Sequence, residues 1–213
     1  MEKMRYKAKT GVSMHATSRL YGLVLAGGKS IRMGRDKGAL QYHQTNQRTY
    51  LYRMLDQFCA ETYISCRSDQ QHIMDSGLPH IVDKNVYGGP LNGMLTAHRA
   101  HPNRAWLVVA VDLPFLSAQS IQSLVENRDP KKVATVYAGH GSNLPEPLVG
   151  IWEPHGLALL AESILETTNR SPRNFLINAD TKLVSPENDL ELFNANSPED
   201  YEEAKILYSR GVI

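Results

Sequence analysis

The sequence predicts an α/β fold in which a mostly parallel, doubly wound sheet lies between two layers of helices. Short apolar runs without polar alternation, typical of strands buried on both faces, alternate along the 213-residue chain with segments of helical spacing. A chain of this length buries about 70% of its unfolded surface on folding, so one core suffices without disulfides. We therefore expect a single-domain, Rossmann-like three-layer sandwich.

Six short apolar or β-branched runs are the expected strands. They cover residues 21–26, 62–65, 80–82, 105–111, 133–137 and 148–152. Strands that alternate with helices are joined by right-handed crossovers, and ligands of such sheets bind beyond the carboxyl ends of the strands. The loops that follow strands are therefore the expected place of function.

Helices are expected between these strands. Apolar residues spaced i, i+3, i+4 and i+7 predict helices over residues 51–58 and 157–164, and shorter helices are expected at 91–98 and after Ser117. The last helix has a capping box at its start. Ser197 is its N-cap, Pro198 is at N1 and Asp200 is at N3.

Charge is balanced overall but uneven along the chain. Lys and Arg total 23 against 22 Asp and Glu, and the first 20 residues carry five cations and one acid. Residues 1–18 are expected to form a disordered basic tail, with a transit peptide as the alternative, and residues 19–213 the folded domain. The overall balance argues against a nucleic-acid partner.

The composition also predicts where the protein resides. No apolar stretch reaches the ~20 residues of a membrane span, so we expect a cytoplasmic protein without a membrane partner. The two cysteines, Cys59 and Cys66, form no CxxC pair, which argues against a disulfide framework and a structural zinc site.

The loop after the first expected strand carries the strongest functional signal. Gly27 and Gly28 precede four cations: Lys29, Arg32, Arg35 and Lys37. Glycines let backbone N–H groups approach phosphate oxygens, and the cations neutralise the charge of a triphosphate. Neither the Walker A spacing nor GxGxxG is present, which disfavours a P-loop NTPase. A solvated turn with a run of charge is the alternative.

Two carboxylates stand at the ends of expected strands. Asp83 follows residues 80–82, where it can accept from a base or a ribose, and Asp112 follows residues 105–111. The carboxylate of Asp112 suits a Mg²⁺ ion that is bound by few protein groups and by the phosphates of the substrate. The alternatives are a solvated loop acid for Asp83 and a helix cap for Asp112, although Ser117 can supply that cap itself.

These motifs resemble those of a known family. Residues 25–37, LAGGKSIRMGRDK, resemble the signature loop of the molybdenum cofactor guanylyltransferases, MobA-like members of the NTP transferase superfamily. Four further segments resemble motifs of this family, and the resemblance spans about residues 21–208. They are the Asp and Gly-Pro-Leu-x-Gly of residues 83–93, PEPLVG at 145–150, SPRNFL at 171–176 and the Asn-x-Asn-x-Pro-Glu within 193–200.

One position departs from the family pattern. Family members often carry an Asn before an Arg after the second strand, and this chain reads Ser65-Cys66-Arg67. The thiol of Cys66 is a weak donor at best, so a hydrogen bond from this position to the base is in doubt.

The resemblance implies a nucleotide-diphospho-sugar transferase-like fold and an activity. Residues 19–213 would form a nucleotidyltransferase domain that transfers GMP from GTP to the phosphate of molybdopterin, with Mg²⁺ as cofactor and pyrophosphate as product. The resemblance also implies that this protein makes transient contact with proteins that carry molybdopterin or that take part in molybdoenzyme maturation. The alternatives are CTP or another phosphate acceptor as substrate, and a non-catalytic nucleotide-binding adaptor.

The resemblance also implies three groups of site residues. The catalytic group is Arg32, Lys37 and Asp112, with Asp112 as the metal ligand. The nucleotide-binding group is Leu25, Ala26, Gly27, Gly28, Lys37, Asp83, Gly89 and Asp112. The acceptor group is Glu146, Arg173, Asn194 and Asn196. From spacing alone, the two asparagines are equally well explained as turn residues before a capped helix.

Overall fold

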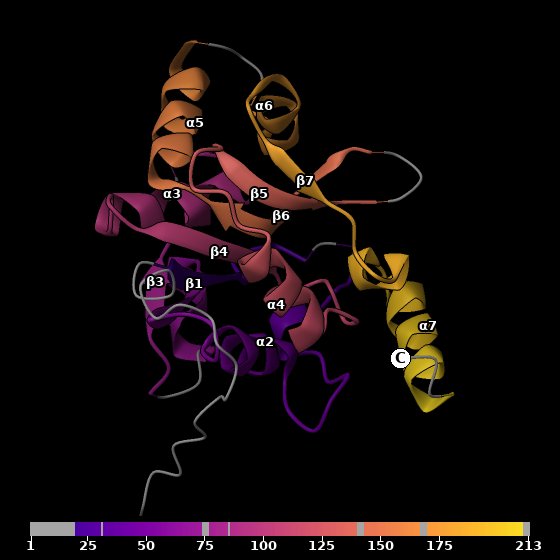
Figure 1. Cartoon of the computed structure of the whole chain (residues 1–213). Coiled ribbons are helices and arrows are strands. Elements are labelled where there is room, and N and C mark those ends of the chain that lie inside the picture. Colours follow the sequence, from indigo (N-terminus) through magenta and orange to yellow (C-terminus); the bar gives the residue numbers. More distant parts are fainter. Residues whose placement is uncertain are drawn as a thin grey trace, which may run out of the picture.

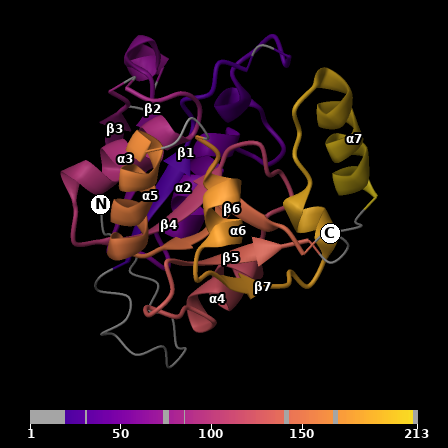
Figure 2. The ribbon, with the colours of Figure 1, turned by 90° about the horizontal axis from the view of Figure 1, so that it is seen from above.

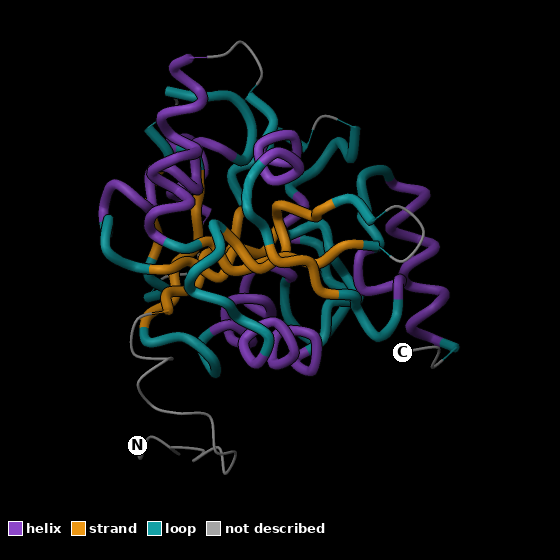
Figure 3. Tube along the Cα trace, turned by 45° about the horizontal axis from the view of Figure 1, so that its top comes forward, coloured by secondary structure: helices purple, strands orange, loops and turns teal. Residues whose placement is uncertain are grey.

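A seven-stranded sheet forms the centre of the molecule. The computed structural model describes residues 20–30, 32–73, 77–84, 86–139, 143–166 and 170–210, so the expected tail of residues 1–18 lies outside them. The strand order is β3-β2-β1-β4-β6-β5-β7. Helices lie on both sides of the strands (Figure 3), and the predicted three-layer α/β architecture is confirmed.

All neighbouring strands except those around β6 are parallel. The strands are β1 (Leu20–Leu25), β2 (Glu61–Cys66), β3 (His80–Val82), β4 (Ala105–Ala110), β5 (Ala134–Ala138), β6 (Pro145–Trp152) and β7 (Lys182–Val184). β6 runs antiparallel to both β4 and β5. Only six residues separate β5 from β6, and so short a connection joins antiparallel neighbours. The edge strand β7 was not predicted, because its three residues carry no clear apolar pattern.

The helices divide between the two faces of the sheet (Figures 1 and 2). On one face lie α2 (Gln47–Leu55) and α4 (Ala118–Glu126), and on the other α3 (Leu91–Ala100), α5 (Pro154–Glu166) and α6 (Pro172–Asn178). The last helix, α7 (Pro198–Ser209), lies beside the sheet and has the predicted capping box. Three 3₁₀ turns complete the described elements: η1 (Lys37–Ala39), η2 (Ser68–Ile73) and η3 (Asp189–Leu192).

Strand β1 is buried on both faces and fixes the centre of the fold. Val24 packs with Leu51 of α2 in one core, whereas Leu23 packs with Met94 of α3 in the other. All six residues of β1 are buried. This alternation follows from the pleat of a strand, and it holds the carboxyl end of β1 rigidly in place.

The strand order reverses its direction at β1. From β1 the chain moves outward to β2 and β3, and then returns to place β4 on the other side of β1. Ligands of doubly wound sheets bind at such a switch point, beyond the carboxyl ends of the strands. The loops after β1, β2 and β4 meet there. Within the described part of the chain, none of the helices combines the length and apolarity that crossing a membrane requires.

Candidate active site

A cavity of about 920 Å³ opens at the switch point. All eight residues assigned to nucleotide binding line it, namely Leu25, Ala26, Gly27, Gly28, Lys37, Asp83, Gly89 and Asp112. Arg32, the third residue of the catalytic group, lines it too. Its walls come from the loops after β1, β2, β3 and β4, so sheet topology brings together residues that are far apart in the sequence.

A second cavity, of about 250 Å³, lies next to the first. The four residues assigned to the acceptor line it, namely Glu146, Arg173, Asn194 and Asn196. Leu148 and Asn196 line both cavities, so the two spaces meet at these side chains. A ligand in one cavity can therefore approach a ligand in the other at this junction.

Lys37 stands at the junction. Its Nζ lies 3.3 Å from Asp112 Oδ2 and donates a hydrogen bond to Asn196 Oδ1 at 2.6 Å. The backbone N–H of Ala195 donates to the carbonyl oxygen of Asp112 at 2.8 Å. The segment before α7 is thereby attached to the carboxyl end of β4, and a cation, a carboxylate and an amide converge on one point.

The carboxylate of Asp112 fits a metal ligand better than a helix cap. Its Oδ1 is buried and has no hydrogen-bond partner, although Oδ2 is paired with Lys37. Ser117 caps α4 by accepting from Ser120 N, which removes the helix-cap alternative for Asp112. Among the described residues, no group of three His, Cys, Asp or Glu could hold a metal. An Mg²⁺ ion at Asp112 would therefore complete its shell with substrate oxygens and water.

Asp83 lies close to Gly27, and both residues line the large cavity. Ser65 Oγ donates to its Oδ1 at 2.6 Å, and the residue is only 8% exposed. Burial raises the pKa of Asp83, although the hydrogen bond from Ser65 and the nearby Arg67 act in the opposite direction. A Cβ on Gly27 would lie 2.5 Å from Asp83 Oδ2, so this close approach requires glycine.

The structure explains how the chain is arranged at Ser65-Cys66, where it departs from the family pattern. Successive side chains of β2 point to opposite sides, and Ser65 lines the large cavity whereas Cys66 is fully buried and does not. Burial raises the pKa of the Cys66 thiol to about 11. Ser65 therefore supplies the polar group from this end of β2, through its hydrogen bond to Asp83.

Two residues after β2 hold the backbone of the glycines. Arg67 donates from one guanidinium nitrogen to the carbonyl oxygens of Gly27 and Gly28, at 3.1 and 2.7 Å. Gln70 donates to the carbonyl oxygen of Ala26 at 3.3 Å. We did not predict either residue as part of the site. Contacts to a backbone carbonyl leave no pattern in the sequence, so only the proximity of β1 and β2 reveals them.

We call residues 26–46, between β1 and α2, the glycine-rich loop. Within it, Asp36 accepts from Gly38 N and forms an ion pair with Arg48 of α2 at 2.5 Å. Asp36 does not line the large cavity, whereas the next residue, Lys37, does. The acid of this motif therefore holds the turn that directs Lys37 into the cavity.

The acceptor group is preorganised by an ion pair. Arg173 Nη2 lies 2.8 Å from both carboxylate oxygens of Glu146, and Nε of the same guanidinium donates to the carbonyl oxygen of Pro145. Residues 145–150, the PEPLVG segment, form most of β6, which begins three residues before the expected strand of residues 148–152. Ser171 caps the unpredicted helix α6, which carries Arg173 to this place. Asn194 and Asn196 do precede a capped helix, and they also line the cavity.

Comparisons with known proteins identify relatives of this chain. A family model described as the MobA-like NTP transferase domain matches residues 22–189. The molybdenum cofactor biosynthesis bifunctional protein of Synechocystis is 36% identical over 183 residues, which cover 85% of this chain and 52% of that protein. This chain thus spans about half the length of that relative. The molybdenum cofactor guanylyltransferase of Rhodopseudomonas palustris is 31% identical, over 88% of this chain and 93% of the relative.

A solved structure shares the fold. It is the molybdopterin-guanine dinucleotide biosynthesis protein A of Archaeoglobus fulgidus, with a TM-score of 0.73 over 89% of this chain and 99% of the other. The two sequences are 21% identical, so this likeness concerns the fold alone.

Proposed function

The chain belongs to the MobA-like NTP transferase family, and from this premise we propose that it is a molybdenum cofactor guanylyltransferase. It would transfer GMP from GTP to the terminal phosphate of molybdopterin and release pyrophosphate. The names of relatives at 28% to 36% identity support this proposal. The resemblance inferred from the sequence is thereby confirmed at the level of the family.

The observation that carries the proposal is the pair of joined cavities. A transfer between two phosphorylated substrates needs two adjoining sites with cationic and amide groups where they meet. The larger cavity of about 920 Å³ has room for a nucleoside triphosphate, and the smaller one is lined by Arg173 and two asparagines. Lys37, Asp112 and Asn196 lie at the junction.

The reaction is an in-line displacement at the α-phosphorus of GTP. An oxygen of the acceptor phosphate forms the new bond to this phosphorus, and the bond to the bridging oxygen of the β-phosphate breaks, which releases pyrophosphate. The acceptor phosphate is largely ionised near neutral pH, so it needs no dedicated general base. Positioning and stabilisation of charge are therefore the main tasks of the protein.

Each group of residues has a part in this scheme. Lys37 and Arg32 stabilise the charge on the phosphates, and Asp83 binds the nucleoside. Arg67 and Gln70 hold the glycine backbone in the shape that receives the triphosphate. Asp112 would hold Mg²⁺, which supplies charge neutralisation and polarises the phosphates when it is bound.

Release of pyrophosphate tests the proposal directly. The protein is incubated with GTP, Mg²⁺ and molybdopterin, and pyrophosphate is measured over time. We expect release only when GTP and molybdopterin are both present. GTP hydrolysis without an acceptor would indicate an NTPase, and nucleotide binding without pyrophosphate release would indicate an adaptor.

Choice of the base is tested by binding. Calorimetric titrations with GTP and with CTP, each with Mg²⁺, compare the two nucleotides under equal conditions. We expect GTP to bind at least about tenfold more tightly, because a base that leaves buried polar groups unpaired is strongly disfavoured. Equal or tighter binding of CTP would reject the assignment of the base.

A further inference from the structure

Helix α7 is held to the rest of the molecule by few side chains. It lies beside the sheet rather than on either face (Figures 1 and 2), and among its residues only Tyr201 and Ala204 are buried. Near its carboxyl end, Tyr208 donates to the carbonyl oxygen of Pro114 at 2.5 Å. Tyr201 is therefore the large buried side chain that anchors the first turns of α7.

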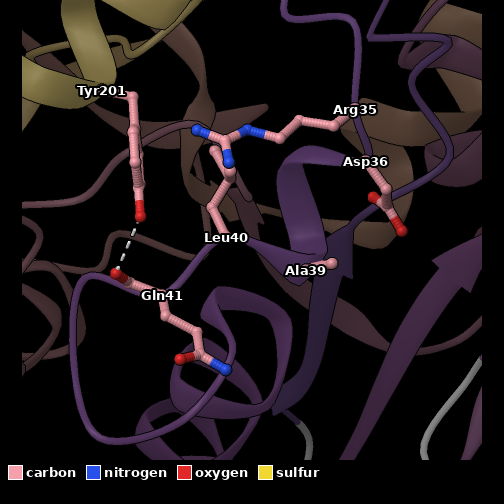
Figure 4. A pocket seen from close by; sticks show the side chains of 6 residues that line it. All are labelled: Arg35, Asp36, Ala39, Leu40, Gln41 and Tyr201. Carbon is pink, nitrogen blue, oxygen red and sulfur yellow. Dashed lines mark hydrogen bonds between the residues drawn. The ribbon is translucent and has the colours of Figure 1, made fainter.

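Tyr201 packs against the glycine-rich loop (Figure 4). Its ring belongs to a small core with Met33 and Leu40, and Arg35 Cζ lies 4.5 Å from the ring centroid. Its hydroxyl donates to the carbonyl oxygen of Gln41 at 3.3 Å. A cavity of about 290 Å³ lies among these residues, so the loop and the helix are not closely packed around the ring. Tyr201 is thus the contact of the loop with the first turns of α7, and near the end of the helix Tyr208 meets His43 of the same loop, with ring centroids 5.1 Å apart.

The residue before Tyr201 holds the acceptor side. Asp200 Oδ2 accepts from the backbone N–H groups of Asn196 and Ser197, at 2.7 and 2.8 Å. These bonds lower the pKa of Asp200, so its carboxylate is charged and the bonds are charge-assisted. The backbone of Asn196 is thereby fixed to the first turn of α7, while its side chain accepts from Lys37.

Two adjacent residues of one helix thus connect the two cavities. We propose that Tyr201 and Asp200 are positioning residues, through which nucleotide binding at the glycine-rich loop orders the acceptor segment, residues 194–197. Neither residue lines the large cavity or the acceptor cavity, so each acts through the groups that it holds. The inference rests on the proposed function and adds the order in which the two substrates bind. The acceptor site is completed after the nucleotide has bound.

The physical basis is restraint passed along rigid elements. Phosphates that engage Lys37 restrain the glycine-rich loop, and the loop restrains the ring of Tyr201. Because an α-helix moves as a unit over one turn, restraint of Tyr201 also restrains Asp200 and the backbone that it holds. The acceptor segment should therefore become less mobile although the nucleotide does not touch α7.

Hydrogen exchange with and without a nucleotide tests this chain of contacts. The probe is GTP with a methylene group between the α- and β-phosphates, which binds without transferring, together with Mg²⁺. In the wild type we expect the amides of peptide 193–203 to exchange about fivefold more slowly with the analogue. In Tyr201→Leu at saturating analogue, we expect most of this slowing to be lost, because only the direct bond between Lys37 and Asn196 remains, although the loop peptide still responds.

Three further variants separate positioning from general stability. Tyr201→Phe keeps the ring and should keep the wild-type response, whereas Asp200→Asn should weaken it, because it removes the charged acceptor. Tyr208→Leu is the matched control, since it removes the other contact of α7 with the glycine-rich loop, at His43, about two helical turns beyond Asp200. It should lower the melting temperature and retain the response to the analogue.

The outcomes distinguish this inference from the proposed function. A wild-type response in Tyr201→Leu, or its equal loss in Tyr208→Leu, would overturn the role of Tyr201. Slower exchange in the loop alone, with no change in peptide 193–203 of the wild type, would overturn the inference and leave the proposed function intact. No response anywhere in the wild type would overturn both.

Discussion

Replacement of Lys37 by alanine probes the junction of the two cavities most directly. The Lys37 side chain is 14% exposed, and its Nζ lies 3.3 Å from Asp112 Oδ2. A unit negative charge about 4 Å from this nitrogen would interact with it by ~4 kcal/mol at an effective dielectric constant of ~20. Because Asp112 and Asn196 share the cation, we expect a net loss of about 3 kcal/mol in the transition state, or ~10²-fold in kcat.

The assay is steady-state pyrophosphate release with saturating GTP, Mg²⁺ and molybdopterin. Lys131→Ala is the control, because Lys131 is an exposed lysine before the amino end of β5, away from both cavities. Thermal melting of both variants shows whether they fold. A folded Lys37→Ala variant with a kcat within about threefold of the wild type would refute the assignment of Lys37 to transition-state charge.

Three more substitutions test the other parts of the site. Asp112→Asn keeps the shape of the side chain and removes its charge, so kcat should fall by ~10² with little change in melting temperature, and retained turnover would reject its role. Gly27→Ala places a Cβ 2.5 Å from Asp83 Oδ2, so calorimetry should show GTP binding weakened by about tenfold or more. Burial raises the pKa of Asp83, so its favourable contribution to stability is present below the unfolded pKa and is lost as pH rises through the folded pKa. Asp83→Asn should therefore melt above the wild type at about pH 8 and converge with it near about pH 3, while binding GTP more weakly, and a constant difference between the two melting curves would contradict this.

The functional role of some site residues could be predicted from the sequence, and that of others could not. Lys37 and Asp112 were readable, because a cation in a glycine-rich loop and an acid at a strand end each have a chemical rationale of their own. Arg67 and Gln70 were not readable as site residues, since their partners are backbone carbonyls of another strand end. Such contacts depend on which strands are neighbours.

The same distinction applies to the fold. Strand β6 runs antiparallel to β4 and β5, and its last four residues are buried like those of the parallel strands, so the residue types give no sign of its direction. The direction of β6 is decided by the short connection from β5 and by the position beside β4 that the other strands leave open. The short helix α6 carries a local signal in its Ser171 N-cap and the following Pro172, which we did not use to predict a helix.

By itself, the sequence determined the features that arise from neighbouring residues. The alternation of buried strands and amphipathic helices predicted the layers, and the Ser197 capping box predicted the start of α7, because periodicity and capping act within one or two turns. The glycines and cations after β1 indicated an anion site for the same local reason. Only the tertiary structure decided that Lys37 meets Asn196, 159 positions away, and that Ser65 rather than Cys66 lines the cavity. Such pairings depend on strand order and register, which arise from packing of the whole chain rather than from any segment of it.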